Sequence, residues 1–227
     1  APQPNFGKQE TAVRPILPGT VAATGFFLKQ PPLEMDSHKQ QVRLSPFAAI
    51  DVGGIAKGWT AQRAADGLMA AGIRGGLIDA GGDVVLWGKE PAQGVWGIGV
   101  ADPLGSGEDI AEFWVEGLTA IATSSVVKRR WQNPGQDPAH HILDPRTGVS
   151  AASDLLQATV VARDLSIAEQ YAKCLLVLGS AAGVPWLAQR RPDLAFVVVR
   201  VDGTIVHSDN LKVYAQEWKV SSRVKQA

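Results

Sequence analysis

The stretch DVGGIAKGWTAQRAADGLMAAGIRGGLIDAGGDVVLWG, residues 51–88, predicts one helix with a glycine-rich turn at each end. From Lys57 onward, small and apolar side chains recur near a period of 3.6 residues, and Gly72 is suited to end the helix. Each turn holds two adjacent glycines beside an acid, which is Asp51 in the first turn. Glycine weakens regular structure, so paired glycines mark places where the backbone bends or approaches another group closely. The stretch therefore predicts a helix framed by two tight turns.

Segments on both sides of this helix alternate irregularly between strand-like and helix-like patterns. A second helix is predicted from Ser166, a suitable N-cap, to Gly179, and a shorter helix over 181–191. The order of these segments lacks the strict βαβ rhythm of a doubly wound sheet. It predicts an α+β fold with a mixed, largely antiparallel sheet packed with helices. Strands are expected within residues 41–44, 75–80, 83–88, 95–102, 113–125, 155–163 and 194–208, the last of them forming a hairpin at Asp202 and Gly203.

The length and composition are those of one globular domain. The chain has 227 residues, of which 45% are hydrophobic and 19% are charged, and these fractions are ordinary for such a domain. Prolines are frequent in the first 32 residues, which show little periodicity. Residues 1–38 are therefore expected to be an irregular proline-rich arm, and residues 39–227 to form the domain.

Charge and cysteine content exclude several kinds of partner and site. The 22 basic and 22 acidic residues balance, so there is no general attraction to nucleic acid or to an anionic membrane. Apolar runs such as 194–199 are much shorter than the roughly 20 residues of a membrane helix, and we expect a soluble protein without a transmembrane segment. Cys174 is the single cysteine, which excludes an internal disulfide and a cysteine-rich zinc site.

The first glycine turn has features of an anion site. The N-terminus of a helix attracts anions through its free N–H groups and its dipole, and Lys57 adds a positive charge there. Gly53 and Gly54 would let a phosphate approach the backbone. The pattern is neither a Walker loop nor the dinucleotide G-x-G-x-x-G. An ordinary glycine turn leading into a surface helix, with Asp51 as a capping carboxylate, explains the same residues.

A second stretch, AHHILDPRTG at residues 139–148, carries adjacent histidines. Histidine is the side chain best suited to move a proton near neutral pH. Adjacent residues entering a strand point to opposite faces, so at most one of the two histidines would face a given site. These residues alone leave open which of the two it is, and DPRTG at 144–148 is a plausible tight turn. A structural role is the more frequent one for any single histidine.

Together these segments resemble a known family. The motifs IDVGGIAKGWTAQRAADGL, IDAGGDVVLWG, WGIGVADP, AIATSS, HHILDPRTG and IAEQYAKCLLVLG occur in the order, and with roughly the spacing, of the FAD:protein FMN transferases, the ApbE family. The resemblance covers about residues 40–200. It implies an enzyme that moves FMN from FAD onto a threonine of a target protein and releases AMP, with Mg²⁺ as cofactor. It also implies a periplasmic or other exported location in the cell envelope.

The resemblance assigns roles to particular residues. The family's positions that contact FAD fall on Asp51, Lys57 and Leu143, and Gly53 lies between them in the phosphate turn. His141 matches the histidine of the family's HIIDP motif and is the candidate catalytic residue for proton transfer, and Asp144 is expected to order the turn. The other histidines, His38, His140 and His207, are expected to be structural or exposed at the surface. A backbone carbonyl that binds the metal in the family falls on Gly54.

The metal site departs from the family pattern. The family's helix motif has an acid and a threonine at i and i+4, whereas AEQYAKC has Glu169 and Lys173. Glutamate can still bind Mg²⁺, but a protonated lysine cannot. A Glu–Lys pair at this spacing is also common helix decoration, contributing about 0.2–0.5 kcal/mol. A sharper hypothesis is that the Lys173 ammonium lies where the cation would lie and pairs with Glu169 or with phosphate. A further change, Ser125 in place of the usual glycine, is mild if its φ is negative.

The resemblance also leaves part of the expected pocket unaccounted for. The family's N-terminal portion is largely absent from the sequence, so we expect a short or N-terminally truncated form. A second copy or another partner chain could cover the open edge of the pocket. The alternative function is therefore a catalytically impaired or non-catalytic module that binds FAD or another nucleotide, or a subunit of the same fold.

Overall fold

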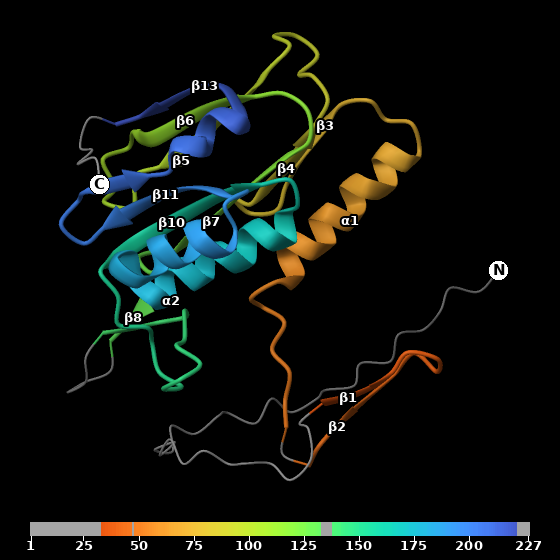
Figure 1. Cartoon of the computed structure of the whole chain (residues 1–227), viewed down its shortest axis with the longest axis vertical. Coiled ribbons are helices and arrows are strands. Elements are labelled where there is room, and N and C mark those ends of the chain that lie inside the picture. The colour runs from red at the N-terminus through yellow and green to blue at the C-terminus, as the bar shows by residue number, and fades with distance from the viewer. Residues whose placement is uncertain (1–32, 47, 133–137, 222–227) are drawn as a thin grey trace.

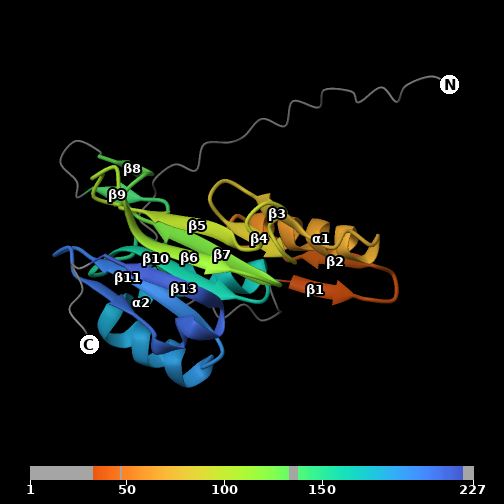
Figure 2. The same cartoon turned by 90° about the horizontal axis from the view of Figure 1, so that it is seen from above.

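The computed structural model of the protein describes residues 33–46, 48–132 and 138–221, most of which form three layers (Figure 1). The central layer is a six-stranded sheet. Helices α1 (Ala56–Ala70) and α2 (Leu165–Arg190) cover one face of it, and a three-stranded sheet covers the other (Figure 2). Every pairing between the described strands is antiparallel. The expected α+β fold with a largely antiparallel sheet is confirmed.

The strands of both sheets lie within the segments where the sequence predicts them, with two exceptions: β6 begins ahead of its predicted segment, and no strand is predicted where β13 forms. The central sheet has the order β12-β11-β10-β7-β4-β3, and the second sheet has the order β13-β6-β5. The central strands are β3 (Gly76–Asp79), β4 (Val84–Trp87), β7 (Thr119–Ser125), β10 (Leu155–Ala162), β11 (Ala195–Arg200) and β12 (Ile205–His207). The second sheet contains β5 (Trp96–Ala101), β6 (Asp109–Val115) and β13 (Ala215–Val220), which follows the short 3-10 helix η1 (Asp209–Val213). The two-residue strands β8 (Arg130–Trp131) and β9 (Ala139–His140) pair with each other.

Side chains of the central strands alternate between two cores. Val85 of β4 packs in the core beneath the helices, whereas Val84 and Leu86 pack against the second sheet. In β11, Val198 and Val197 divide in the same way. Successive side chains of a strand point to opposite faces, so a strand covered on both faces is apolar throughout. The apolar runs at 84–87 and 195–199 are therefore central strands.

Helix α2 reverses direction at Gly179, whose backbone has φ 76° and ψ 171°. A Cβ added to Gly183 would lie 3.5 Å from Cα of Leu175, and the rings of Tyr171 and Trp186 stack with centroids 5.6 Å apart. The two halves of α2 therefore run side by side in opposite directions. This course is required because β10 and β11 are antiparallel neighbours, so their connection must return to the sheet edge where it began. The predicted helix end at Gly179, and the shorter helix after it, are confirmed.

The start of α2 differs from the expectation. Asp164 is the N-cap, and its side chain accepts a hydrogen bond of 3.1 Å from the backbone N–H of Ile167. Ser166 lies inside the first turn, so its prediction as the N-cap is wrong. The carboxylate of Asp164 reaches the same free N–H groups from further upstream and carries the negative charge that a helix N-terminus favours.

By length and composition, α2 is the one helix of the described residues that could cross a membrane. The core helix of a globular domain has the same features. Helix α2 reverses at Gly179 and packs on the central sheet, a course unlike that of a single straight span. The described residues therefore contain no clear membrane-spanning segment.

Strands β1 (Leu33–Asp36) and β2 (Gln41–Leu44) form a hairpin that extends away from the layers (Figure 1). The expectation of an irregular arm over residues 1–38 is wrong at residues 33–36. These residues pair in register with β2, which satisfies their backbone groups, and Glu34 lies 3.8 Å from Arg43 across the pair. Residues 1–32 of the expected arm lie outside the described residues.

Candidate functional site

A cavity of about 290 Å³ lies where the N-terminal end of α1, the turn between β3 and β4, the end of β7 and the first half of α2 meet. Its lining combines glycines, hydroxyl groups and charged side chains. The titratable residues that line it are Lys57, Lys128, Arg129, His141, Glu169 and Lys173. Four of these side chains are cationic at neutral pH and one is anionic, so the cavity is suited to a negatively charged ligand.

Lys57 and Asp83 join the two glycine turns of the opening stretch. Nζ of Lys57 lies 2.7 Å from Oδ2 of Asp83, whose side chain is only 3% exposed. Oδ1 of Asp83 accepts a hydrogen bond of 3.0 Å from the backbone N–H of Thr123 in β7. The carboxylate is thus held from two sides and fixes Lys57 at the edge of the cavity. The acid beside the second glycine pair serves to position this lysine.

Glu169 lies at the contact between α1 and α2, and its side chain is 1% exposed. Its Oε2 accepts a hydrogen bond of 2.7 Å from the backbone N–H of Gly58, and its Oε1 lies 2.9 Å from Nζ of Lys173. The N–H groups of a helix's first turn have no partners within the helix, so Glu169 caps α1 from the neighbouring helix. A Cβ added to Gly58 would lie 2.8 Å from Oε2 of Glu169 and 2.7 Å from the carbonyl oxygen of Leu165. The absence of a side chain at Gly58 therefore permits this contact.

His141, from a segment distant in the sequence from Lys57, also lines the cavity. Its pKa is lowered from the usual histidine value, first because part of the imidazole is withdrawn from water. Electrostatic interactions with Arg129, His140 and Lys173 lower the pKa further, whereas a hydrogen bond with the backbone of Arg129 acts in the opposite direction. Near pH 7 the imidazole is therefore neutral and able to accept a proton.

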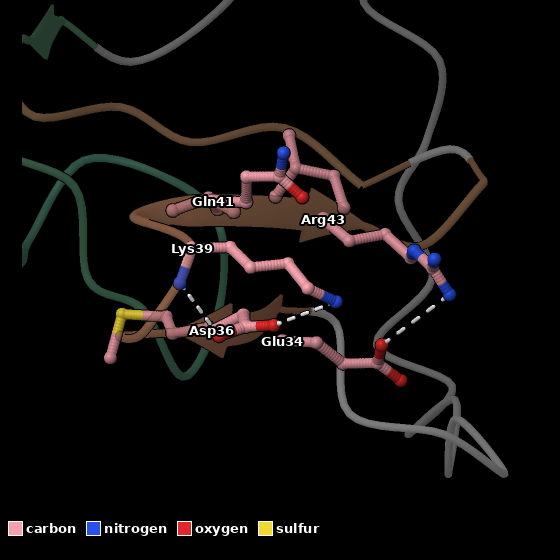
Figure 3. A pocket seen from close by; sticks show the side chains of 8 residues that line it. Glu34, Asp36, Lys39, Gln41 and Arg43 are labelled. Atoms are coloured by element: carbon pink, nitrogen blue, oxygen red, sulfur yellow. Dashed lines mark hydrogen bonds and ion pairs between the residues drawn. The ribbon is translucent and has the colours of Figure 1, made fainter.

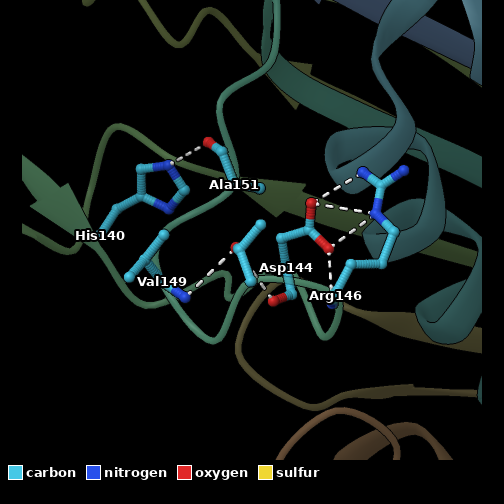
Figure 4. A network of polar contacts seen from close by, with 6 residues as sticks. His140, Asp144, Arg146, Val149 and Ala151 are labelled. Atoms are coloured by element: carbon cyan, nitrogen blue, oxygen red, sulfur yellow. Dashed lines mark hydrogen bonds and ion pairs between the residues drawn. The ribbon is translucent and has the colours of Figure 1, made fainter. Parts of the chain in front are cut away.

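The neighbouring His140 has a structural role (Figure 4). It is buried, its Nε2 lies 3.1 Å from the carbonyl oxygen of Ala151, and its Nδ1 accepts a hydrogen bond of 3.3 Å from the backbone N–H of Ile142. Asp144 orders the following turn by accepting hydrogen bonds from the backbone and guanidinium of Arg146, which lower the pKa of the carboxyl. These contacts hold the segment so that His140 faces the core and His141 faces the cavity.

The structure brings together part of the residue set that the sequence indicates. Gly53, Lys57, His141 and Glu169 all line the cavity. Gly54 does not line it, but a Cβ added there would lie 3.8 Å from Cδ of Lys173.

Asp51 and Leu143 lie outside this lining. The Asp51 carboxylate accepts a hydrogen bond of 2.7 Å from the backbone N–H of Gly53, which is the capping role that the simpler interpretation gives it. Leu143 is 55% exposed and forms an isolated β-bridge with Ser150.

Several backbone N–H groups of the first turn are already occupied. Gly53 donates to Asp51, Ile55 and Ala56 both donate to the carbonyl oxygen of Val52, and Gly58 donates to Glu169. The positive character of the cavity consequently comes mainly from lysine and arginine side chains. In the second glycine turn the N–H of Gly82 is also occupied, since it donates to Oδ1 of Asp79 at 2.7 Å. Gly81 and Gly82 have φ of 70° and 91°, conformations that favour glycine.

The lining of the cavity also contains residues that the sequence did not indicate. Lys128 and Arg129 follow β7, and the basic run KRR at 128–130, two residues after ATSS, was the available signal. Gly58 carried no comparable signal, and the place of Asp83 beside the second glycine pair did not indicate its partners, because both roles depend on contacts with distant segments. Ser125 is not among the described residues with positive φ, so its replacement of the family's glycine is compatible with the backbone.

A larger cavity, of about 630 Å³, lies along the β1–β2 hairpin (Figure 3). All of its lining residues belong to the hairpin itself, and they include the ion pairs Lys39–Asp36 at 3.3 Å and Arg43–Glu34 at 3.8 Å. These side chains are largely exposed and their charges are mutually paired. This hairpin surface offers no convergent reactive groups, so we do not assign it as the functional site.

The residues of the candidate site do not fit a divalent metal. Both oxygens of Glu169 are occupied by the Gly58 N–H and by Lys173, and the ammonium of Lys173 would repel a second cation. Across residues 33–46, 48–132 and 138–221, no three His, Cys, Asp or Glu side chains gather as a metal site. The expected metal roles of Gly54 and Glu169 therefore gain no support from this geometry.

These features define an antiparallel α+β domain with a cationic cavity suited to a phosphate-bearing ligand. Residues 21–198 match the model of the ApbE family. The chain belongs to the ApbE family, as its motifs indicate.

Solved structures and curated relatives agree with this assignment. The ApbE protein from Thermotoga maritima is similar, with a TM-score of 0.70 and 30% identity over 82% of this chain and 60% of that one. The flavin transferase ApbE from Vibrio cholerae, at 22% identity, shares the fold, with a TM-score of 0.63 over 81% of this chain and 58% of that one. The FAD:protein FMN transferase of Klebsiella pneumoniae is 30% identical over 158 residues, covering 69% of this chain and 48% of the relative. The chain spans about half the length of the curated relatives it matches.

Proposed function

We propose that this protein transfers FMN from FAD onto a threonine hydroxyl of an acceptor protein, with release of AMP. Its membership of the ApbE family and the names of its relatives, FAD:protein FMN transferases, support this activity. The observation that carries the proposal is that Lys57, Arg129 and His141 line one cavity. Such a cavity offers positive charge to a diphosphate and a neutral imidazole to a hydroxyl group.

In the proposed reaction, the threonine oxygen attacks the phosphorus of the FMN half of the diphosphate. A new P–O bond forms, the bond from this phosphorus to the bridging oxygen breaks, and AMP leaves with that oxygen. The hydroxyl proton passes to the imidazole of His141 as general base. Lys57 and Arg129 stabilise the negative charge of the nonbridging oxygens, which is the main requirement of phosphoryl transfer.

The remaining contacts with FAD are part of the same proposal. Gly53 and Lys57 would face the diphosphate, because both line the cavity. Asp51 and Leu143 would contact FAD outside this lining, where Leu143 offers an exposed apolar side chain. A rim of this kind suits the flat, largely apolar ring system of the flavin.

The direct test is to incubate the protein with FAD and a threonine-bearing acceptor and to measure AMP together with covalently bound flavin. The proposal predicts that the two products appear in equal amounts and that neither appears when the acceptor threonine is replaced by valine. AMP that forms equally fast without an acceptor would indicate hydrolysis of FAD instead, and would contradict the proposed transfer.

A second candidate function is favoured by the ion pair between Lys173 and Glu169. Lysine at this position differs from the family pattern, and a protein of this kind could bind FAD or another nucleotide without transferring it. The same assay separates the two functions, because a binding module quenches flavin fluorescence on titration but yields no AMP.

Partners and location remain part of the proposal. A second copy or another chain would cover the open edge of the pocket, and sedimentation of the protein with and without FAD would detect such an assembly. Location in the cell envelope rests on the family resemblance, and fractionation of cells that express the full-length protein would test it.

A further inference from the structure

We infer that Lys173 is a built-in cation of this cavity, and that the site binds the diphosphate of a dinucleotide without a divalent metal. The inference rests on the proposed function, because it names how that same site holds its substrate. It starts from the disagreement between the residues present and the metal that the family implies.

The first step concerns Glu169, the one carboxylate in the lining. It is buried at 1% exposure, and a buried carboxylate must be paired and hydrogen-bonded to remain charged. The Gly58 N–H at 2.7 Å and the Lys173 ammonium at 2.9 Å supply these partners. A metal could bind Glu169 only by displacing Lys173, and the displaced ammonium would remain beside it, since both residues lie on the same helical face.

The second step concerns the free capacity of Lys173. An ammonium group has three hydrogen-bond donors, and Glu169 is its one partner in the part of the chain that the structure describes. The Lys173 side chain is 25% exposed and lines the cavity. It can therefore keep its bond to Glu169 and donate to a phosphate oxygen at the same time.

The third step concerns the overall charge of the site. Four cationic side chains line the cavity: Lys57, Lys128, Arg129 and Lys173. They exceed the two buried carboxylates of the site, which are Glu169 in the lining and Asp83 beside Lys57. Among the described residues, neither Lys128 nor Arg129 forms an ion pair. The excess complements a diphosphate directly, without a metal to reverse the charge of acidic ligands.

The experiment is a titration with FAD, followed by flavin fluorescence, in buffer with excess EDTA and in buffer with Mg²⁺. If Lys173 is the built-in cation, the Kd for FAD should differ less than about twofold between the two buffers. Replacing Lys173 with threonine (K173T) should weaken binding in EDTA by about tenfold or more, the effect of losing a charged hydrogen bond. Mg²⁺ should restore part of the affinity of this variant, because the repelling ammonium is gone.

Two further variants serve as controls for the effect of K173T. Lys173→Arg keeps the charge and should retain most of the affinity in EDTA, which separates loss of charge from a general disturbance of α2. Lys89→Thr removes another lysine that pairs with a glutamate, Glu116 at 3.0 Å, but lies outside the cavity, and should leave the Kd unchanged. Thermal unfolding followed by circular dichroism identifies any variant that fails to fold.

The outcomes separate this inference from the proposed function. Binding of FAD by the wild-type protein that requires Mg²⁺, or affinity that K173T leaves unchanged, would overturn the built-in cation alone. No binding of FAD in either buffer would overturn both. Binding in EDTA that is weakened by K173T and kept by Lys173→Arg would support the inference even if no acceptor were ever flavinylated.

Discussion

The backbone N–H of Ser180 donates a hydrogen bond of 2.7 Å to Oδ1 of Asp154, so an acid just before β10 caps the second half of α2. The hydroxyl of Ser180 donates to Oδ2 of the same carboxylate. Partial burial acts to raise the pKa of Asp154, but the hydrogen bonds from Ser180 and the charge of Arg200 outweigh it, and the pKa is lowered. The reversal of α2 is thus fixed by an ionised side chain next to Gly179.

Replacing Asp154 with alanine should lower the free energy of unfolding by about 1 kcal/mol at pH 7, as expected for the loss of an N-cap. The pKa of Asp154 is lower in the folded than in the unfolded state. Its contribution is therefore present above the unfolded value of about 4 and is lost as the pH falls through the folded value. Urea unfolding at pH 7 and pH 3 should show the difference from wild type shrinking at pH 3. Ser180→Ala, which keeps the backbone hydrogen bond, should have a smaller effect, and an undiminished difference at pH 3 would contradict this account.

Gly58→Ala should destabilise the protein, although alanine is the better helix former. Its Cβ would lie within 3 Å of both Leu165 and Glu169, so α1 and α2 would have to separate. We expect a loss of about 1–3 kcal/mol in the free energy of unfolding, typical of overpacking. Gly67→Ala in the same helix is the matched control, because an added Cβ there meets no atom within 4 Å. This control should stabilise by about 0.5–1 kcal/mol, and equal effects at the two glycines would be inconsistent with a close helix contact at Gly58.

Asp83→Ala should destabilise the protein more than the loss of an exposed carboxylate. It removes the acceptor of the Thr123 N–H and the partner of Lys57. A buried donor left without a partner costs about 1–3 kcal/mol. Glu116→Ala, which breaks the surface pair with Lys89, should have a much smaller effect on stability, because water and salt screen an exposed ion pair. Chemical denaturation of both variants tests the difference, and Asp83→Ala should also weaken binding of FAD because Lys57 loses its fixed position.

His141→Ala should leave binding of FAD nearly unchanged but slow the transfer about 10²–10⁴-fold, the usual contribution of a general base. Because the pKa of His141 is lowered, the imidazole stays neutral below the usual histidine value of about 6.5. The transfer rate of the wild type should therefore be level near pH 7 and fall only as the pH drops through that lower value. His38→Ala, in the hairpin turn, is the control and should behave like wild type. Transfer by His141→Ala at the wild-type rate would remove His141 from the mechanism.

Local patterns in the sequence predicted most of the secondary structure. The period of 3.6 residues from Lys57 and the left-handed preference of Gly179 are properties of short segments, and both helices form there. The prediction of Ser166 as the cap failed because Asp164, two residues upstream, offers a stronger acceptor. Choosing between two nearby caps depends on the exact entry of the chain, which local composition does not determine.

The site was predictable only in part, because long-range contacts build it. The motifs indicated Lys57, His141, Glu169 and Lys173, and all four line the cavity. The role of Asp83 depends on Thr123, which lies 40 positions away, and the role of Gly58 depends on Glu169, which lies 111 positions away. No spacing within one segment encodes such contacts, so they emerge only when the sheet and the helices have packed.

The reversal at Gly179 divides α2, the connection between β10 and β11, into an outgoing limb before Gly179 and a returning limb after it, and the two have different roles. The outgoing limb carries Glu169 and Lys173, whereas the returning limb contributes no residue to the cavity and mainly shields the sheet. Labels, tags or stabilising substitutions on the returning limb should consequently leave the charges around a bound nucleotide unchanged. That limb is therefore a suitable place to modify this domain.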